Sequence, residues 1–205
     1  MNRLFWLITF FSVFIWSAIS PHDRIIWLLE TAPAIIGLIL IIATYKSFPL
    51  TTLVYSLILI HCVILMVGGH YTYAEVPLFN DLKELIGSSR NNYDKVGHFA
   101  QGFIPAMITR EIVIRKHVFN NVAWQNFFIV CFCLAFSAFY ELIEWGVAIV
   151  SGEGAHAFLG TQGYIWDTQS DMGYALFGAI LSLLLLNRQH DQQLQNLVQA
   201  KALSR

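Results

Sequence analysis

The amino-acid sequence predicts an all-α membrane protein, a bundle of about six transmembrane helices with a polar pocket near the outer face. Hydrophobic residues make up 57% of the 205 residues and charged residues only 12%, about half of the ~25% that soluble domains carry. The apolar residues fall into six runs, and ionisable side chains recur at the ends of four of them. The net charge of −1 gives no sign of nucleic-acid binding, so membrane lipids are the expected partners.

The six apolar runs are expected to be helices that cross the bilayer. A span needs roughly 20 apolar residues, and lipid offers no partner to an unpaired backbone group. The expected spans are 4–19, 25–44, 53–67, 96–114, 124–150 and 172–186. The first run resembles a secretory signal, but Pro21 follows it at once and five more runs lie downstream. We therefore interpret it as an uncleaved span.

The positive charges predict that both termini lie in the cytoplasm. With the N-terminus inside, the inner segments hold eight Lys and Arg residues and the outer segments hold four, which is the usual bias. The loops 68–95 and 151–171 would then lie on the outer side. Within the first loop, apolar residues between Leu78 and Ile86 recur at helical spacing. They predict a short helix at the outer interface.

Polar residues gather at the predicted outer ends of four spans, and this shared depth indicates a functional site. Ionisable groups inside a membrane are costly and are by default functional candidates. The spacing puts those of each helix on one face, since residues three and four apart are neighbours. The candidates are His70; Asp94, Lys95, His98 and Gln101; Glu141 and Glu144; and Trp166, Asp167 and Asp171.

Several of these residues also have a purely structural interpretation. Asp94, Asp167 and Asp171 can each cap the helix that they begin, and for each one capping and chemistry weigh about equally. His70 at a helix C-terminus can bind the last carbonyls, an interpretation that we favour slightly over a metal ligand. Glu141 and Glu144 resist such an explanation best. Each costs roughly 2.5–3.5 kcal/mol in a span, and together they repel unless a proton, a cation or His98 lies between them.

Three segments resemble the YjdF family of bacterial inner-membrane proteins, and the resemblance extends over nearly the whole chain. The segments are 93–99, 141–145 and 159–172. The resemblance implies a multi-pass protein of the bacterial inner membrane and adds no chemistry of its own.

A more distant similarity links spans four to six to the VanZ-like family, which is tied to glycopeptide resistance and the cell envelope. The residues that match its pattern are Asp94, Lys95, His98, Phe99, Glu141, Asp167 and Gly178. The chain departs from the pattern where Glu144 replaces a Gln, Asp171 an Asn and Tyr174 a Gly. The extra carboxylates favour a cation site in this chain.

We consider three functions. The first is an enzyme acting on an envelope lipid or lipid-linked molecule, with Glu141 or Glu144 as general base and His98 as acid, base or ligand. His70, His98, Glu144, Asp167 and Asp171 are the candidate ligands of a divalent cation, and this mixed set suits Zn²⁺, Mn²⁺ or Fe²⁺. Asp94, Lys95, Gln101 and Trp166 are the candidate substrate contacts.

The two other functions use the same carboxylates differently. In a transporter or a lipid- or drug-binding protein they would carry protons or bind a cationic ligand. In a structural scaffold the polar residues would only hold the helices together. The sequence has no Gly-x-Ser-x-Gly motif, which argues against hydrolysis through an acyl-serine.

Overall fold

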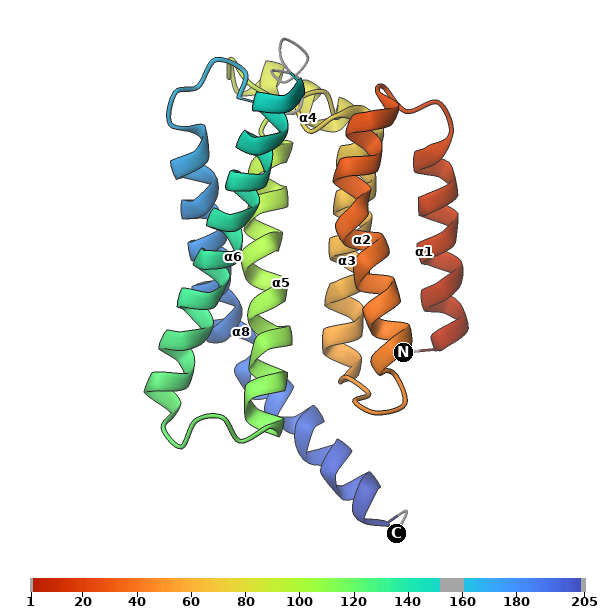
Figure 1. Ribbon diagram of the computed structural model, residues 1–205, viewed down its shortest axis with the longest axis vertical. Helices are drawn as coiled ribbons and strands as arrows, with labels where there is room; N and C mark the ends of the chain where they lie inside the picture. The colour runs from red at the N-terminus through yellow and green to blue at the C-terminus, as the bar shows by residue number, and fades with distance from the viewer. Residues whose placement is uncertain (1, 152–160, 204–205) are drawn as a thin grey trace.

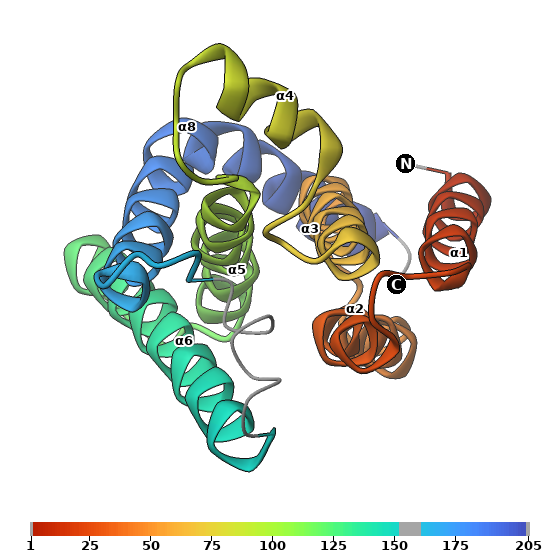
Figure 2. The same ribbon diagram turned by 90° about the horizontal axis from the view of Figure 1, so that it is seen from above.

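The computed structural model describes residues 2–151 and 161–203. The described residues form seven α-helices and no strand, which confirms the all-α prediction (Figure 1). Six helices lie side by side, and the short α4 crosses one end of them (Figures 1 and 2). The helices are α1 (Arg3–Ala18), α2 (Arg24–Thr44), α3 (Thr52–Tyr71), α4 (Pro77–Leu85), α5 (Tyr93–Arg115), α6 (Val122–Ser151) and α8 (Asp167–Leu203).

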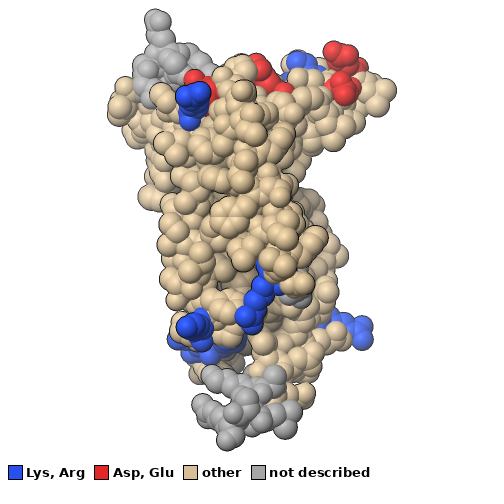
Figure 3. All heavy atoms as spheres, turned by 90° about the vertical axis from the view of Figure 1, so that its right-hand side faces the viewer, with Lys and Arg blue, Asp and Glu red and all other residues tan. Residues whose placement is uncertain are grey.

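Four described helices are long and apolar enough to cross a membrane, and they belong to α2, α3, α6 and α8. The apolar α1 is shorter. Large apolar side chains such as Ile42, Phe127 and Leu184 remain exposed on the helices, as expected of a surface that contacts lipid. In Figure 3 the visible charged side chains gather toward the two ends of the molecule, with Asp and Glu at the α4 end.

The central helix α5 is buried rather than apolar. It carries charged side chains near both ends, yet most of its residues are buried. It packs against α3, α6 and α8 (Figure 2). Because neighbouring helices supply partners for its polar groups, a helix with this composition can lie inside a membrane protein.

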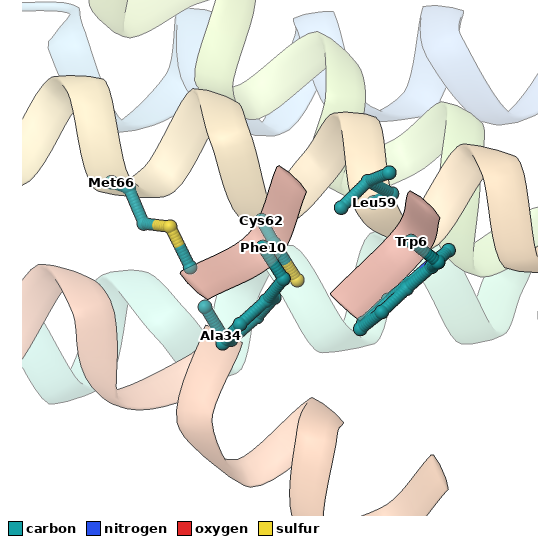
Figure 4. Packing of buried hydrophobic residues seen from close by; sticks show 6 residues of the cluster. All are labelled: Trp6, Phe10, Ala34, Leu59, Cys62 and Met66. Carbon is teal, nitrogen blue, oxygen red and sulfur yellow. The ribbon is translucent and has the colours of Figure 1, made fainter. Parts of the chain in front are cut away.

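Two apolar clusters hold the helices together. One joins α1, α2 and α3 through Trp6, Phe10, Ala34, Leu59, Cys62 and Met66 (Figure 4). The other joins α5, α6 and α8 through Ala106, Val113, Ile129, Cys133, Ala179 and Leu183.

Small residues let α5 and α8 approach very closely. A Cβ atom at Gly102 would overlap the backbone carbonyl of Ala175, and one at Gly178 would overlap the carbonyl of Phe99. Close backbone contact through small residues is a common way to associate helices in membranes, where apolar burial gives little driving force. This contact fixes α8 against the helix that carries His98.

The helices α4 and α8 show how the observed helices compare with the expected ones. The expected short helix is α4, and its Leu78, Leu82 and Leu85 are exposed. The last helix is longer than the expected span 172–186, because α8 begins at Asp167 and continues to Leu203. The first turns of its polar second half contact the bundle, where His190 and Leu194 are buried, and the end of the helix extends away from the other helices (Figure 1).

Candidate functional site

The loops that precede α5 and α8 are joined by hydrogen bonds. The Asn91 backbone N–H donates to the Gln162 side chain, which in turn donates to the Asn91 carbonyl, both at 2.9 Å. The Asn91 side chain also donates to the carbonyl of Val76 and to Asn80. These bonds set the two helix N-termini beside each other at the α4 end of the molecule.

Two cations and two carboxylates form the base of the site. The Lys95 ammonium donates to Asp167 Oδ1 at 2.7 Å and to Asp171 Oδ1 at 2.6 Å. Arg90 donates to the same Asp167 oxygen at 2.7 Å and lies 3.5 Å from Asp94. Lys95 and both of its partners are buried. Charged groups in such surroundings are stable only when paired in this way.

His98 lies between the carboxylates of three helices. Its Nε2 is 3.4 Å from Asp94 Oδ1 and 4.0 Å from Asp171 Oδ1. Its Nδ1 is 3.1 Å from Gln101 Oε1 and 3.7 Å from Glu141 Oε1. The amide oxygen of Gln101 can only accept, so Nδ1 donates to it and Nε2 faces the two aspartates. We call Arg90, Asp94, Lys95, His98, Glu141, Asp167 and Asp171 the His98 cluster.

The His98 cluster has the donor set and the charge of a cation site. One ligand atom each from Asp94, His98 and Asp171 lies within 4.8 Å of the other two. Four carboxylates in the cluster face two permanently charged side chains, and the buried Oε1 of Glu141 has no hydrogen-bond partner among the described residues. A divalent cation would balance this charge. The residues present therefore fit such an ion.

A long apolar groove opens beside the His98 cluster. It encloses about 900 Å³ between α2, α3, α5 and α6, and its walls are mostly apolar. This volume lies in the range of ligand sites, ~300–1,000 Å³. Asp94 and His98 line one end of it. Glu30 of α2, Tyr73 and Tyr140 line the same end, although the sequence did not predict them as part of the site.

Two glutamates at this end of the groove have no cationic partner. Glu30 is only 6% exposed, and Glu144 is half-buried. Neither forms an ion pair with any residue that the structure describes. Burial, and next the nearby Glu30 carboxylate, raises the pKa of the Tyr73 hydroxyl well above its ordinary value. Tyr73 lies between α3 and α4, and its hydroxyl stays a hydrogen-bond donor at this end of the groove.

The remaining candidates lie in different places. The structure brings Asp94, Lys95, His98, Gln101, Glu141, Asp167 and Asp171 together, with Glu144 on the adjoining groove. His70 lies apart, where its Nδ1 contacts the Ser17 carbonyl at 3.0 Å and its ring packs on Trp16. Trp166 is 58% exposed directly before α8.

A second buried cluster joins α5 and α8 on the side of the bundle opposite to the His98 cluster. Glu111 accepts from the Thr51 backbone and hydroxyl, from Arg115 at 2.7 Å and from His190 at 3.1 Å. Arg110 donates to His190 Nδ1 at 2.9 Å, so the proton of that ring is on Nε2 and points to Glu111. We call Thr51, Arg110, Glu111, Arg115 and His190 the Glu111 cluster.

The Glu111 cluster, Arg90 and Glu30 are not among the site residues that the sequence predicts. Glu111 and Arg115 are four residues apart, a spacing that favours an ion pair and could have drawn attention to them. Glu30 is a single acid within an apolar run, and an intramembrane acid is itself a signal. No local pattern connects His190 to Glu111.

The comparisons with known proteins agree with a membrane protein. The chain matches the family described as "Predicted membrane protein (DUF2238)" over residues 2–192. It is 50% identical over 183 residues to the inner membrane protein YjdF of Escherichia coli (strain K12), covering 89% of this chain and 88% of that protein. No solved structure matches it.

Proposed function

This chain belongs to the DUF2238 family of predicted membrane proteins, and we propose that it is a cation-dependent enzyme of the bacterial inner membrane. Its substrate would be an envelope lipid or a lipid-linked molecule. One observation carries the proposal: the ligand atoms of Asp94, His98 and Asp171 converge within 4.8 Å beside an apolar groove of ligand size. The name of the Escherichia coli relative supports the location.

Asp94, His98 and Asp171 would hold the divalent cation. An imidazole with carboxylates suits Zn²⁺, Mn²⁺ or Fe²⁺. Such an ion, when bound, polarises a substrate oxygen or lowers the pKa of a bound water. Gln101 holds the His98 ring so that Nε2 faces the aspartates. This is the kind of partner that orients a metal-binding imidazole.

The other residues of the His98 cluster have supporting roles. Glu141 Oε1 is buried, has no hydrogen-bond partner in the part of the chain that the structure describes, and lies 3.7 Å from the His98 ring, so Glu141 is the general base in this proposal. Lys95 holds Asp171 and Asp167 in place, and Arg90 fixes Asp167 from the other side. Asp167 therefore supports the ligands through Lys95. Glu144 faces the groove and would contact the substrate.

Cation binding tests this proposal directly. We expect the purified full-length protein to bind one Zn²⁺ or Mn²⁺ per chain, measured by elemental analysis and by titration. Asp171→Asn should weaken binding by about 100-fold, because changes to the partners of ligands alone already cost ~10–100-fold. Asp81→Asn, on the exposed face of α4, is the control and should bind as the wild type does. Equal binding by both variants would refute the cation site.

The orientation of the chain remains a separate proposal. We propose that both termini are cytoplasmic and that the His98 cluster opens toward the outer side. The eight-to-four distribution of Lys and Arg supports this orientation. Reporter fusions at Ser88 and at Lys201 should report opposite compartments. If both report the same compartment, the proposed topology is wrong.

A further inference from the structure

The two ends of the apolar groove differ in charge. Glu30, Asp94, His98 and Glu144 line one end, and the described lining residues of that end include no Lys or Arg. The single lysine of the lining, Lys116, lies at the C-terminus of α5 and therefore at the opposite end. A molecule in the groove thus meets carboxylates at one end and an ammonium group at the other.

The groove is long enough for an extended hydrocarbon chain. Glu30 and Thr44 both line it from α2, and their separation along the helix is roughly 20 Å at ~1.5 Å per residue. One leaflet of the bilayer core is about 15 Å thick, half of ~30 Å. Between these residues the α2 wall consists of apolar and glycine residues, among them Ala34, Gly37 and Leu40.

The unpaired glutamates indicate what the head of that molecule carries. Glu30 lies inside an apolar helix and is almost fully buried, yet no described Lys, Arg or His forms an ion pair with it or with Glu144. Charged groups at such positions are found paired or facing a cavity that binds a partner. The two glutamates face the same groove. A positively charged group entering from the groove would supply the missing counter-charge.

We infer that the groove binds a cationic amphiphile, an amine-bearing lipid or long-chain amine, with its ammonium group at the Glu30 and Glu144 end. The hydrocarbon chain lies along α2 and α5 toward Lys116. Charge complementarity selects this occupant over an anionic lipid, whose head would meet Glu30 and Glu144, the two carboxylates of the polar end that form no ion pair with a described residue. The inference rests on the proposed function only in that the same groove would deliver the substrate to the His98 cluster.

Photolabelling of the full-length protein in phosphatidylcholine nanodiscs tests the inference. The probes are hexadecylamine, hexadecanol and hexadecanoic acid, each with the same photoreactive group in the chain. We expect the amine to label groove residues of α2 and α5 about tenfold more than the alcohol does, a difference of about 1.4 kcal/mol. The double variant Glu30→Gln, Glu144→Gln should reduce amine labelling to the level of the alcohol.

Two glycine variants separate the groove from the rest of the surface. A Cβ at Gly37 or at Gly146 meets no atom within 4 Å, so both positions accept a larger side chain. Gly37 lines the groove, whereas Gly146 of α6 does not. Gly37→Phe should block labelling by the amine, and Gly146→Phe should leave it unchanged. Because neither change removes a carboxylate, this pair remains informative if the double glutamate variant is unstable.

Three results would overturn the inference: equal labelling by amine and alcohol, preferential labelling by the acid, or amine labelling that Gly37→Phe does not reduce. Labelling is carried out with a metal chelator present, so it does not depend on the cation site. Amine labelling without cation binding would refute the enzyme proposal alone. Cation binding without amine preference would refute this inference alone.

Discussion

The His98 cluster and the Glu111 cluster lie at opposite ends of the same helix pair and use the same residue types. Each joins α5 to α8 through acidic side chains, basic side chains and one histidine, and Asp191 adds a second acid at the Glu111 end. In the Glu111 cluster, both oxygens of Glu111 accept hydrogen bonds, and Glu111 and His190 are fully buried. Buried hydrogen bonds that occupy both oxygens of a carboxylate in this way make packing specific.

The His98 cluster differs from the Glu111 cluster in three respects. It has more carboxylates than Lys and Arg side chains, a buried carboxylate oxygen, Glu141 Oε1, has no hydrogen-bond partner among the described residues, and Asp94 and His98 open on the groove. Histidine and acid in a membrane helix therefore do not by themselves identify a functional site. An excess of carboxylates over Lys and Arg beside the groove distinguishes the His98 cluster from the Glu111 cluster.

The largest expected effect is a loss of stability when the Glu111 cluster is disrupted. Glu111→Ala removes the common acceptor of Thr51, Arg115 and His190, and it should lower the free energy of unfolding by about 3–5 kcal/mol, since it leaves buried partners unpaired. Denaturant or thermal unfolding in detergent measures this change. Glu84→Ala on the exposed surface of α4 is the control and should leave stability unchanged. A Glu111 variant as stable as the wild type would contradict the structural role.

The contact between the two clusters should give the next largest effect. Gly102→Ala places a methyl group against the Ala175 carbonyl, and overpacking of this kind costs typically 1–3 kcal/mol. Because α5 and α8 carry both clusters, we expect loss of stability together with weaker cation binding. Gly37→Ala adds the same methyl group where no atom lies within 4 Å. If the two variants unfold alike, close packing of α5 on α8 does not hold the clusters.

Helices could be predicted from the sequence because apolar runs of span length leave the backbone few alternatives in lipid. The end of α8 could not. The residues after Leu186 are polar and resemble a solvated tail, and only their contact with Arg110 and Glu111 explains why His190 is buried. Such partners lie about 80 residues away in the chain, and no periodicity within one segment reveals them.

Part of the candidate site could also be predicted from the sequence. Helical spacing placed His98, Gln101 and Glu141 among the candidates, since each lies within an apolar run and on a defined helix face. The pairing of Lys95 with Asp167 and Asp171 was not predictable, because it depends on how the loops before α5 and α8 are joined. Glu30 was missed because a lone acid has no spacing to examine, although it faces the groove directly.

Glu144→Gln should have the smallest effect on stability, and it best tests whether the two clusters differ in role. Glu144→Gln keeps the shape of the side chain and removes an ionisable carboxyl group that forms no ion pair with any described residue. Stability should stay equal or rise by about 1 kcal/mol, since replacing an unpaired buried charge is neutral or favourable. Labelling by the long-chain amine should fall at the same time.

Glu111→Gln is the matched control, because the same change there removes a charge that Arg115 and His190 need, and it should lower the melting temperature. If Glu144→Gln unfolds as easily as Glu111→Gln, or if it is more stable with unchanged amine labelling and cation content, Glu144 has a packing role and the groove end is structural as well.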